Sequence, residues 1–346
     1  MSPIDNPAIP KGATVLVTGV NGLIGAQVAD KFLEIGYKVR GTVRDAKKNA
    51  WLSEVFGAKY GQDKFELFCV PDMAAEGAFD KAKKGVCAFV HVASILTWDP
   101  NPDNVIPGVV AGALIAAKAA ASEPSIRRFV FTSSSWATVM PIADTKVVID
   151  ENTWDNDVVK EVEGAGKEPP YGPRQSQNVY GASKTLAEQA VWKWVEETKP
   201  NMVVNCVLPA ANFGKALSIK HQGHPSTSYW VQLLWEGNTE PMKNDPPQQF
   251  TDVEDVGWLH VVGAIHPDVK SERIFGSAGP FQFNDILAWL RKWYPDRQFP
   301  EDFMKGRDLT EWKPRARAEA LLKDIGRPGF TSLEQSIKNN LEGLAY

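Results

Sequence analysis

The chain has 346 residues, of which 43% are hydrophobic and 23% are charged. This composition is typical of a folded globular protein and argues against disorder, and the length allows one α/β enzyme with an additional lobe. The net charge of -4 gives no long-range attraction to nucleic acid or anionic lipid, so we expect neither as a partner.

The termini and apolar runs predict neither a targeting segment nor a spanning helix. The start MSPIDNPAIPKG lacks the basic and apolar regions of a secretory signal. The apolar stretch from Val105 to Ala117 is shorter than the ~20 apolar residues that cross a bilayer. Cys69, Cys87 and Cys206 lie in contexts typical of core strands, with spacing that fits neither zinc nor a redox pair. We therefore expect a cytoplasmic protein with reduced cysteines and no metal. His221 and His224, in the loop-like segment HQGH, have no evident third ligand, so we expect them to be solvated loop histidines.

Short apolar runs rich in β-branched residues alternate with helix-length segments through the first part of the chain. The first such run leads into a predicted helix over residues 26–36. Near-continuous apolar strands separated by helices indicate a parallel sheet covered on both faces, which is a doubly wound α/β fold. The predicted strands cover residues 13–19, 37–43, 65–70, 88–94, 127–134 and 203–209.

The first predicted strand runs directly into TGVNGLIG, residues 18–25. Glycine permits a tight turn and the close approach of backbone to phosphate, and the helix that follows points its positive N-terminus at a pyrophosphate. The loop opens the first βα unit, where a dinucleotide fingerprint belongs, although a plain strand-to-helix turn is the alternative. The predicted cofactor-binding residues of this loop are Gly19, Asn21, Gly22, Leu23, Ile24 and Gly25.

The end of the second predicted strand, KVRGTVRD, is basic. NAD-specific sites usually carry an acid here for the ribose hydroxyls, whereas this segment offers Arg40, Thr42 and Arg44, with Lys48 soon after. Guanidinium groups suit a 2'-phosphate through charge-assisted hydrogen bonds. NADP is therefore favoured over NAD, although Asp45 argues the other way. We predict phosphate contacts from Arg44 and Lys48, with a solvated basic turn as the alternative.

The stretch NVYGASK, residues 178–184, sets Tyr180 and Lys184 four residues apart on a predicted helix. Residues at this spacing share a face, so both side chains can project toward one point. A tyrosine becomes an effective acid when an ammonium stabilises its phenolate. A reducible carbonyl also needs a donor at its oxygen, and Ser133, Ser134 and Ser135 after the fifth strand all qualify by chemistry.

The βα alternation fades after residue 209, where longer helical segments follow. Residues 226–237, 283–295 and 332–344 read as helices of a smaller lobe. We predict an NADP-binding Rossmann domain over residues 1–208, with a loop insertion at about 140–178. Residues 209–346 then form mainly a helical substrate lobe, interleaved with elements that complete the first domain.

Three motifs in this order resemble the extended short-chain dehydrogenase/reductases: the G-x-x-G-x-x-G loop, a serine after the fifth strand, and the Y-x-x-x-K helix. More narrowly, VRGTVRD, RRFVFTSS, IDENTWDN and YGASKTLAEQAVWKW resemble the dihydroflavonol 4-reductase and cinnamoyl-CoA reductase group. The IDN-x-x-x-P start, GYKVRGT and the IGRPG-x-x-S-x-E-x-SIK ending resemble microbial NADPH-dependent aldehyde and carbonyl reductases of the aldehyde reductase II type. That resemblance covers essentially the whole chain.

The resemblance implies NADPH-dependent reduction of small-molecule carbonyl compounds, and it implies a role for each matching residue. Ser134 would polarise the carbonyl, Tyr180 would donate the proton, and Lys184 would lower the pKa of Tyr180 and hold the nicotinamide ribose. Pro209 would lie beside the nicotinamide. Further cofactor contacts are implied at Asp72 and Met73 for adenine, and at Val92, Ala93 and Ser94 along the edge of the cleft.

Departures from the family patterns leave the substrate open. Met140 replaces the asparagine of the plant flavonoid enzymes, the NWYCY signature of the cinnamoyl-CoA enzymes is absent, and Ala210 replaces an asparagine of the microbial reductases. We expect aldehydes or ketones, with ketoesters among the candidates. A nucleotide-sugar epimerase or dehydratase and a non-catalytic NADP(H) sensor are the alternatives. The predicted substrate-binding residues are Trp98, Trp136, Phe213 and Trp230.

Overall fold

The computed structural model describes residues 4–344, and its centre is a seven-stranded parallel sheet. The strand order is β10-β7-β5-β4-β1-β2-β3. The order reverses direction beside β1, which places a crevice at the carboxyl ends of the strands, where ligands bind in open α/β sheets. The strands are β1 (Thr14–Thr18), β2 (Lys38–Val43), β3 (Phe65–Cys69), β4 (Ala88–His91), β5 (Arg128–Thr132), β7 (Val203–Pro209) and β10 (Arg273–Gly276).

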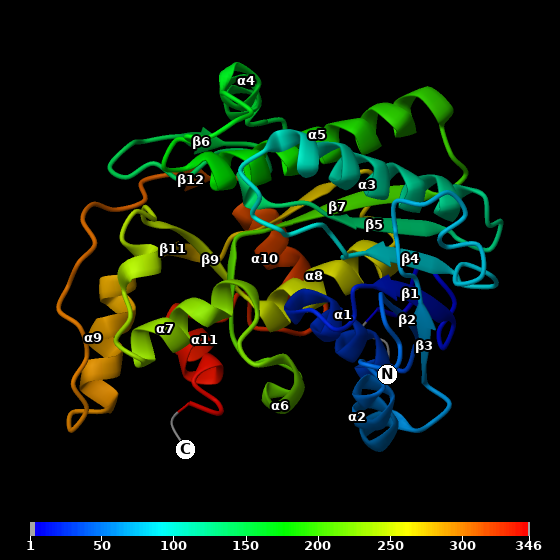
Figure 1. Ribbon diagram of the computed structural model, residues 1–346. Helices are drawn as coiled ribbons and strands as arrows, with labels where there is room; N and C mark the ends of the chain where they lie inside the picture. The colour runs from blue at the N-terminus through cyan, green and yellow to red at the C-terminus, as the bar shows by residue number, and fades with distance from the viewer. Residues whose placement is uncertain (1–3, 345–346) are drawn as a thin grey trace.

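Helices cover both faces of this sheet, as Figure 1 shows. On one face lie α3 (Ile106–Ala121) and α5 (Gln175–Thr198), and on the other lie α1 (Leu23–Glu34), α8 (Val253–Ile265) and α10 (Arg315–Asp324). The alternation of β1 explains the two cores, because Val15 and Val17 pack with α1 and α8 while Leu16 packs with α3 and α5. The predicted doubly wound fold is confirmed. The helix α2 (Trp51–Tyr60) connects β2 to β3.

A smaller lobe at the left of Figure 1 has its own apolar core. The short α6 (Ile219–Gln222) lies outside that core, where Ile219 packs against a cluster that includes Leu23 of α1. The lobe contains the predicted helices α7 (Tyr229–Trp235), α9 (Phe283–Trp293) and α11 (Leu333–Asn340). It also contains a three-stranded sheet that the sequence did not predict. Its strands are β8 (Ala211–Phe213), β9 (Gln248–Asp252) and β11 (Gly279–Phe281).

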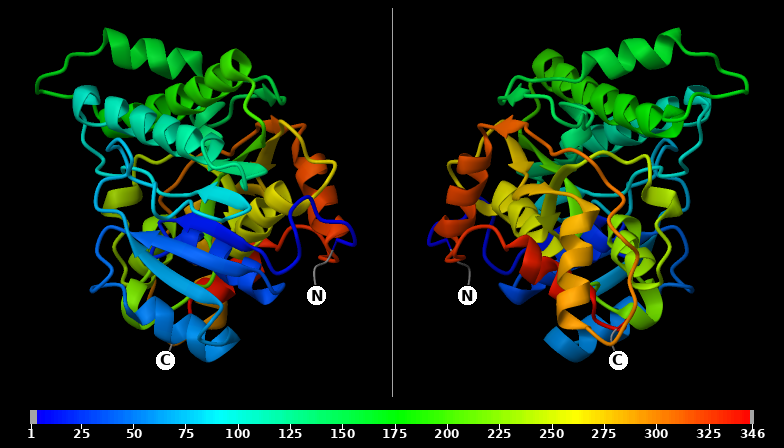
Figure 2. Two further views of the ribbon diagram at one scale, coloured as in Figure 1. Left: turned by 90° about the vertical axis from the view of Figure 1, so that its right-hand side faces the viewer. Right: turned by 90° about the vertical axis from the view of Figure 1, so that its left-hand side faces the viewer.

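The region from residue 140 to 178 is more ordered than a loop insertion. It contains α4 (Asn156–Gly164) and the strand β6 (Val148–Ile149), which pairs in parallel with β12 (Glu311–Trp312). The helix α4 packs along α5, and this green segment lies at the upper edge of the molecule in Figure 2. Four short 3-10 helices complete the described elements: η1 (Pro102–Asn104), η2 (Ser135–Ala137), η3 (Ser226–Ser228) and η4 (Glu240–Met242).

Three expectations need correction. Within residues 4–344, the segment Pro102–Ala121 is long and apolar enough to cross a membrane by length and composition, with a mean hydropathy of 1.6. Here it forms η1 and α3, and α3 packs against α5. Cys69 is exposed at the end of an outer strand, and His224, expected as a solvated loop histidine, is buried beside Asn340.

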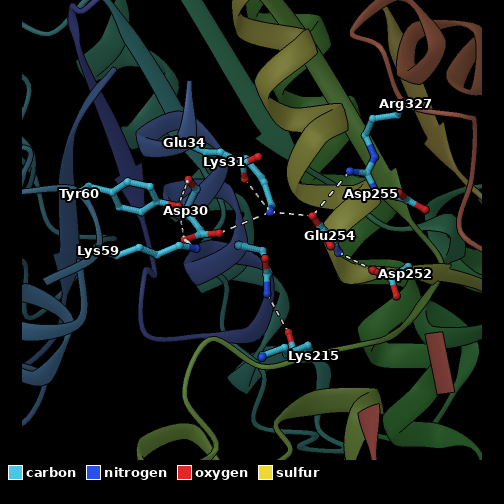
Figure 3. A network of polar contacts seen from close by, with 11 residues as sticks. Asp30, Lys31, Glu34, Lys59, Tyr60, Lys215, Asp252, Glu254, Asp255 and Arg327 are labelled. Carbon is cyan, nitrogen blue, oxygen red and sulfur yellow. Dashed lines mark hydrogen bonds and ion pairs between the residues drawn. The ribbon is translucent and has the colours of Figure 1, made fainter. Parts of the chain in front are cut away.

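Charged side chains tie α1 to both α2 and α8, as Figure 3 shows. Lys31 contacts Glu254 at 2.8 Å and Asp30 at 3.4 Å, and Asp30 in turn accepts hydrogen bonds from Lys59 and Tyr60, both at 2.8 Å. Burial alone would lower the pKa of Lys31, but the hydrogen bond and charge of Glu254 outweigh it, so the pKa is raised. The network fixes the helix that carries the glycine loop.

Candidate active site

The glycine loop turns tightly between β1 and α1. Gly19 has φ of 68°, a backbone conformation that favours glycine, and the Gly22 N–H donates to its carbonyl at 3.0 Å. A Cβ at Gly25 would overlap the Gly19 carbonyl, and one at Gly19 would come within 3.1 Å of the Ala93 backbone. The first and third glycines of this turn, Gly19 and Gly25, therefore exclude larger side chains for packing reasons as well.

The start of α1 suits the phosphates of a dinucleotide. Gly22 is the N-cap, so the first free backbone N–H groups of the helix belong to Leu23, Ile24 and Gly25. No acidic side chain lies in this first turn, so nothing opposes an anion there. The glycine cradle and the helix terminus thus fit a pyrophosphate, while Asn21 is exposed beside them.

A neighbouring segment covers this loop in a way that the sequence did not predict. Gln222, at the end of α6, donates to the carbonyls of Asn21 and Gly22 at 3.1 and 3.3 Å. The ring of His221 stacks on Trp51 with centroids 4.8 Å apart. The expectation of solvated histidines in HQGH missed this contact, because it forms between segments far apart in the chain.

The basic residues within and after β2 differ in whether their side chains already have partners. The Arg40 guanidinium pairs with Glu66 and donates at 2.8 Å to the carbonyls of Ala82 and Lys84. Arg44 and Lys48 are exposed, and neither side chain forms a hydrogen bond or ion pair with the residues described. Arg44 follows the carboxyl end of β2, so its guanidinium remains available to an anionic ligand.

The remaining predicted cofactor residues lie at or near the carboxyl ends of the strands. Thr18 accepts hydrogen bonds from the N–H groups of Val92 at 2.9 Å and Ala93 at 3.0 Å, which holds the segment after β4 against the end of β1. Ser94 follows this segment and is partly exposed. Asp72 is exposed, whereas the Met73 side chain lies near Gly112 of α3. Pro209 is buried at the end of β7.

Tyr180 and Lys184 share one face of α5, and the Ser134 side chain interacts with the Tyr180 phenol and lowers its pKa. Ser134 has extended backbone at the N-cap of η2, where its Oγ also accepts from the Trp136 N–H at 3.2 Å. Ser133 points elsewhere, because its hydroxyl donates to Glu188 at 2.6 Å. Of the three serines, Ser134 is therefore the one that the structure brings to the tyrosine.

The Lys184 ammonium is buried and donates to the Thr132 carbonyl at 2.8 Å. Burial lowers the pKa of Lys184 to about 8, while the negative charge of Glu188 acts in the opposite direction. Burial raises the pKa of Tyr180, and the hydrogen bond from Ser134 offsets part of that rise. Desolvation therefore dominates the pKa of Tyr180 in this structure, and the Lys184 ammonium hydrogen-bonds the Thr132 carbonyl.

Thr132 is held by a histidine of α8, and no sequence motif pointed to this contact. Its hydroxyl lies 2.7 Å from His260 Nε2, and His260 Nδ1 lies 2.8 Å from the Val256 carbonyl one turn earlier on α8. Burial lowers the pKa of His260 to about 4, so its ring is neutral at physiological pH. A residue from the opposite face of the sheet thus holds the end of β5 in place for Lys184.

Two of the four predicted substrate residues flank the tyrosine. The rings of Trp98 and Trp136 have centroids 5.1 and 5.6 Å from that of Tyr180. Trp98 is 51% exposed and has φ of 55°, a left-handed conformation that is uncommon for a bulky residue. Trp98 and Trp136 therefore both pack against the Tyr180 ring.

The other two substrate predictions fall in the core of the lobe. Phe213 has no exposed surface and packs edge-on against Phe281, with centroids 5.0 Å apart. The prediction that Phe213 lines the substrate pocket is therefore wrong, because its ring is enclosed by its own core. Trp230 is partly buried and packs against Phe213, Phe281 and Phe283.

A cavity of about 690 Å³ lies away from these residues, at the β10 edge of the sheet. Its wall includes Trp154, Trp192, Arg273, Lys313 and Arg317, and none of the predicted site residues. In residues 4–344, no group of three or more His, Cys, Asp or Glu side chains could hold a metal ion.

The sequence is similar to known proteins along almost its whole length. The model of the NAD dependent epimerase/dehydratase family matches residues 15–275. The chain is 39% identical to aldehyde reductase 2 of Sporidiobolus salmonicolor, over 98% of each chain. It is 36% identical to a ketoreductase of Penicillium rubens, over 99% of each chain.

A solved structure of similar fold is that of the yeast methylglyoxal/isovaleraldehyde reductase complexed with NADPH. The TM-score is 0.78 at 23% identity, covering 95% of this chain and 97% of that one. The family model spans most of the chain, and two relatives match it almost from end to end. The chain therefore belongs to the NAD dependent epimerase/dehydratase family, the extended short-chain dehydrogenase/reductases.

Proposed function

We propose that this protein is an NADPH-dependent reductase that converts aldehydes and ketones to alcohols. The observation that carries the proposal is the interaction of the Ser134 side chain with Tyr180, on the face of α5 that also bears Lys184. These three groups are a donor for a carbonyl oxygen, a proton source and a buried cation. The names of the two relatives, an aldehyde reductase and a ketoreductase, support the same reaction.

Each group of the chain has a defined task in this reaction, for which bound NADPH supplies the hydride. The Ser134 hydroxyl donates a hydrogen bond to the carbonyl oxygen, where negative charge develops. Tyr180 then gives its proton to that oxygen. The raised pKa of Tyr180 keeps the phenol protonated at neutral pH, which is the form that a reduction requires.

Lys184 serves the tyrosine and the cofactor together. Its ammonium has three donors, and in this structure Thr132 accepts from it. The donors that remain can bind the hydroxyls of the nicotinamide ribose, and the positive charge stabilises the phenolate that proton transfer leaves. Loss of the Lys184 charge should therefore slow proton transfer as well as weaken ribose binding.

The choice of NADPH over NADH rests on Arg44 and Lys48. Both are exposed and lie after β2, where the adenosine ribose of a Rossmann domain is bound. Arg40 is already committed to Glu66 and two carbonyls, so it does not compete for the phosphate. We propose that Arg44 makes the main contact with the 2'-phosphate.

The substrate side is aromatic. Trp98 and Trp136 flank the phenol, so apolar substituents of a carbonyl compound would pack between indole rings. Medium-sized aldehydes, aryl ketones and ketoesters all meet this requirement. Trp98 is half exposed, which leaves room for groups that extend toward solvent.

The direct test follows NADPH absorbance with a panel of aliphatic aldehydes, aryl ketones and β-ketoesters, with NADH in parallel. The proposal predicts turnover with NADPH and little with NADH. Purification with tightly bound NAD and turnover of a nucleotide sugar without added nicotinamide would instead identify an epimerase or dehydratase. Binding of NADPH without turnover of any carbonyl would indicate a sensor.

A further inference from the structure

A carboxylate with no exposed surface lies one helical turn beyond Lys184 on α5. Tyr180, Lys184 and Glu188 follow at intervals of four residues, so their side chains lie along one face of the helix. A buried charge is costly unless it is paired and hydrogen-bonded. The surroundings of Glu188 therefore reveal whether it serves the fold, the site or both.

Glu188 is paired on every side. Arg273, from the edge strand β10, contacts its two oxygens at 2.7 and 3.2 Å. Trp192 donates to Oε1 at 3.2 Å, and Ser133 donates to Oε2 at 2.6 Å. This arrangement satisfies both carboxylate oxygens and holds them in one orientation, with Lys184 as the neighbour of Glu188 along the helix.

Glu188 is the acidic side chain that acts on Lys184. From β4, His91 faces the ammonium but is neutral, because burial and the Lys184 charge lower its pKa to about 3. From β7, the Cys206 thiol is also neutral, because burial raises its pKa. From β5, the centroid of the Phe131 ring lies 5.4 Å from Lys184 Nζ, and the Thr132 carbonyl accepts a hydrogen bond from the same ammonium. These elements supply dipoles, and Glu188 supplies the charge that opposes desolvation.

The same carboxylate reaches the carbonyl-binding side of the site. Ser133 donates its hydroxyl to Glu188 and its N–H to the Val207 carbonyl at 2.8 Å. Both groups anchor the residue that precedes Ser134. The backbone can then present the Ser134 hydroxyl to Tyr180.

We propose that Glu188 is a positioning residue: it places a buried carboxylate one helical turn from Lys184, and its bond to Ser133 orients the segment that carries Ser134. The effect that this inference predicts on turnover rests on the proposed function. The electrostatic part of the inference concerns Lys184 alone and can be measured without a substrate.

The test separates charge from shape. Glu188→Gln should move the alkaline limb of the kcat/KM profile by about one pH unit toward acid, because it removes the attraction that opposes burial of the ammonium. Glu188→Asp keeps the charge and should restore the position of that limb. Ser133→Ala removes the hydrogen bond but keeps the charge, so it should lower kcat and leave the limb in place.

Glu188→Gln also leaves Arg273 buried without a partner, which can prevent folding. The double variant Glu188→Gln with Arg273→Gln removes both charges and avoids that cost. It should show the same acid shift, because Glu188 shifts the pKa of Lys184 whereas Arg273 is not among the groups that do so.

The readout that does not need turnover is the titration of Lys184 by NMR of lysine labelled at Nζ, with the signal identified by its loss in Lys184→Arg. A fall in the Lys184 pKa in both Gln variants, and no fall in Ser133→Ala, supports the inference. An unchanged Lys184 titration in both Gln variants overturns it, as does an equal shift in Ser133→Ala. Failure of carbonyl reduction in the wild type would reject the proposed function and leave this titration decisive for Glu188.

Discussion

Replacing Arg44 by leucine should reduce discrimination between NADPH and NADH. A hydrogen bond to a charged group contributes about 1.5–3 kcal/mol, and we expect the lower end because Arg44 is exposed and Lys48 remains nearby. A loss of about 1.4 kcal/mol is tenfold in Kd. Arg40 cannot compensate, because Glu66 and two carbonyls hold its guanidinium.

The assay is a titration of each cofactor, followed by fluorescence or calorimetry. Arg44→Leu should weaken NADPH binding about tenfold, leave NADH binding unchanged and flatten the salt dependence of NADPH binding. Arg127→Leu is the matched control, since it removes an exposed guanidinium just before β5, at the opposite end of the strands. Equal loss of both cofactors in Arg44→Leu, or no loss of either, would refute the reasoning.

Two further substitutions test the scaffold. Gly25→Ala places a Cβ against the Gly19 carbonyl, so NADPH affinity should fall by about tenfold or more. Gly164→Ala is its control, because nothing lies within 4 Å of the added Cβ, and this variant should leave NADPH affinity unchanged. Lys31→Ala breaks a buried network and should lower the free energy of unfolding in urea by about 2 kcal/mol, while kcat/KM is retained. Lys193→Ala, which removes an exposed ion pair, is its control. Equal stability of the two variants would contradict the account.

The sequence predicts the sheet and its two layers because their cause is local. Each central strand is a run of apolar residues buried on both faces, and residues such as Leu16 and Val17 alternate between the two cores. The glycine loop is equally readable, because a positive φ and close backbone contacts demand glycine. The partnership of Tyr180 and Lys184 follows from helical spacing alone.

Other features depend on contacts between distant segments, which one sequence does not reveal. Which of the three consecutive serines interacts with Tyr180 depends on Glu188, because the Ser133 hydroxyl donates a hydrogen bond to Glu188 instead. The burial of Phe213 depends on Phe281, which is 68 residues later. The position of Gln222 over the glycine loop depends on α6, a helix too short to be read from periodicity.

The most direct measurement is carbonyl-dependent NADPH oxidation by Tyr180→Phe. The substitution removes the proton donor and the hydroxyl that Ser134 contacts, while the glycine loop and Arg44 are untouched. The account predicts a loss of kcat/KM of about 100-fold or more, with NADPH affinity and folding retained. Full activity in Tyr180→Phe would contradict the proposed reaction at its central step.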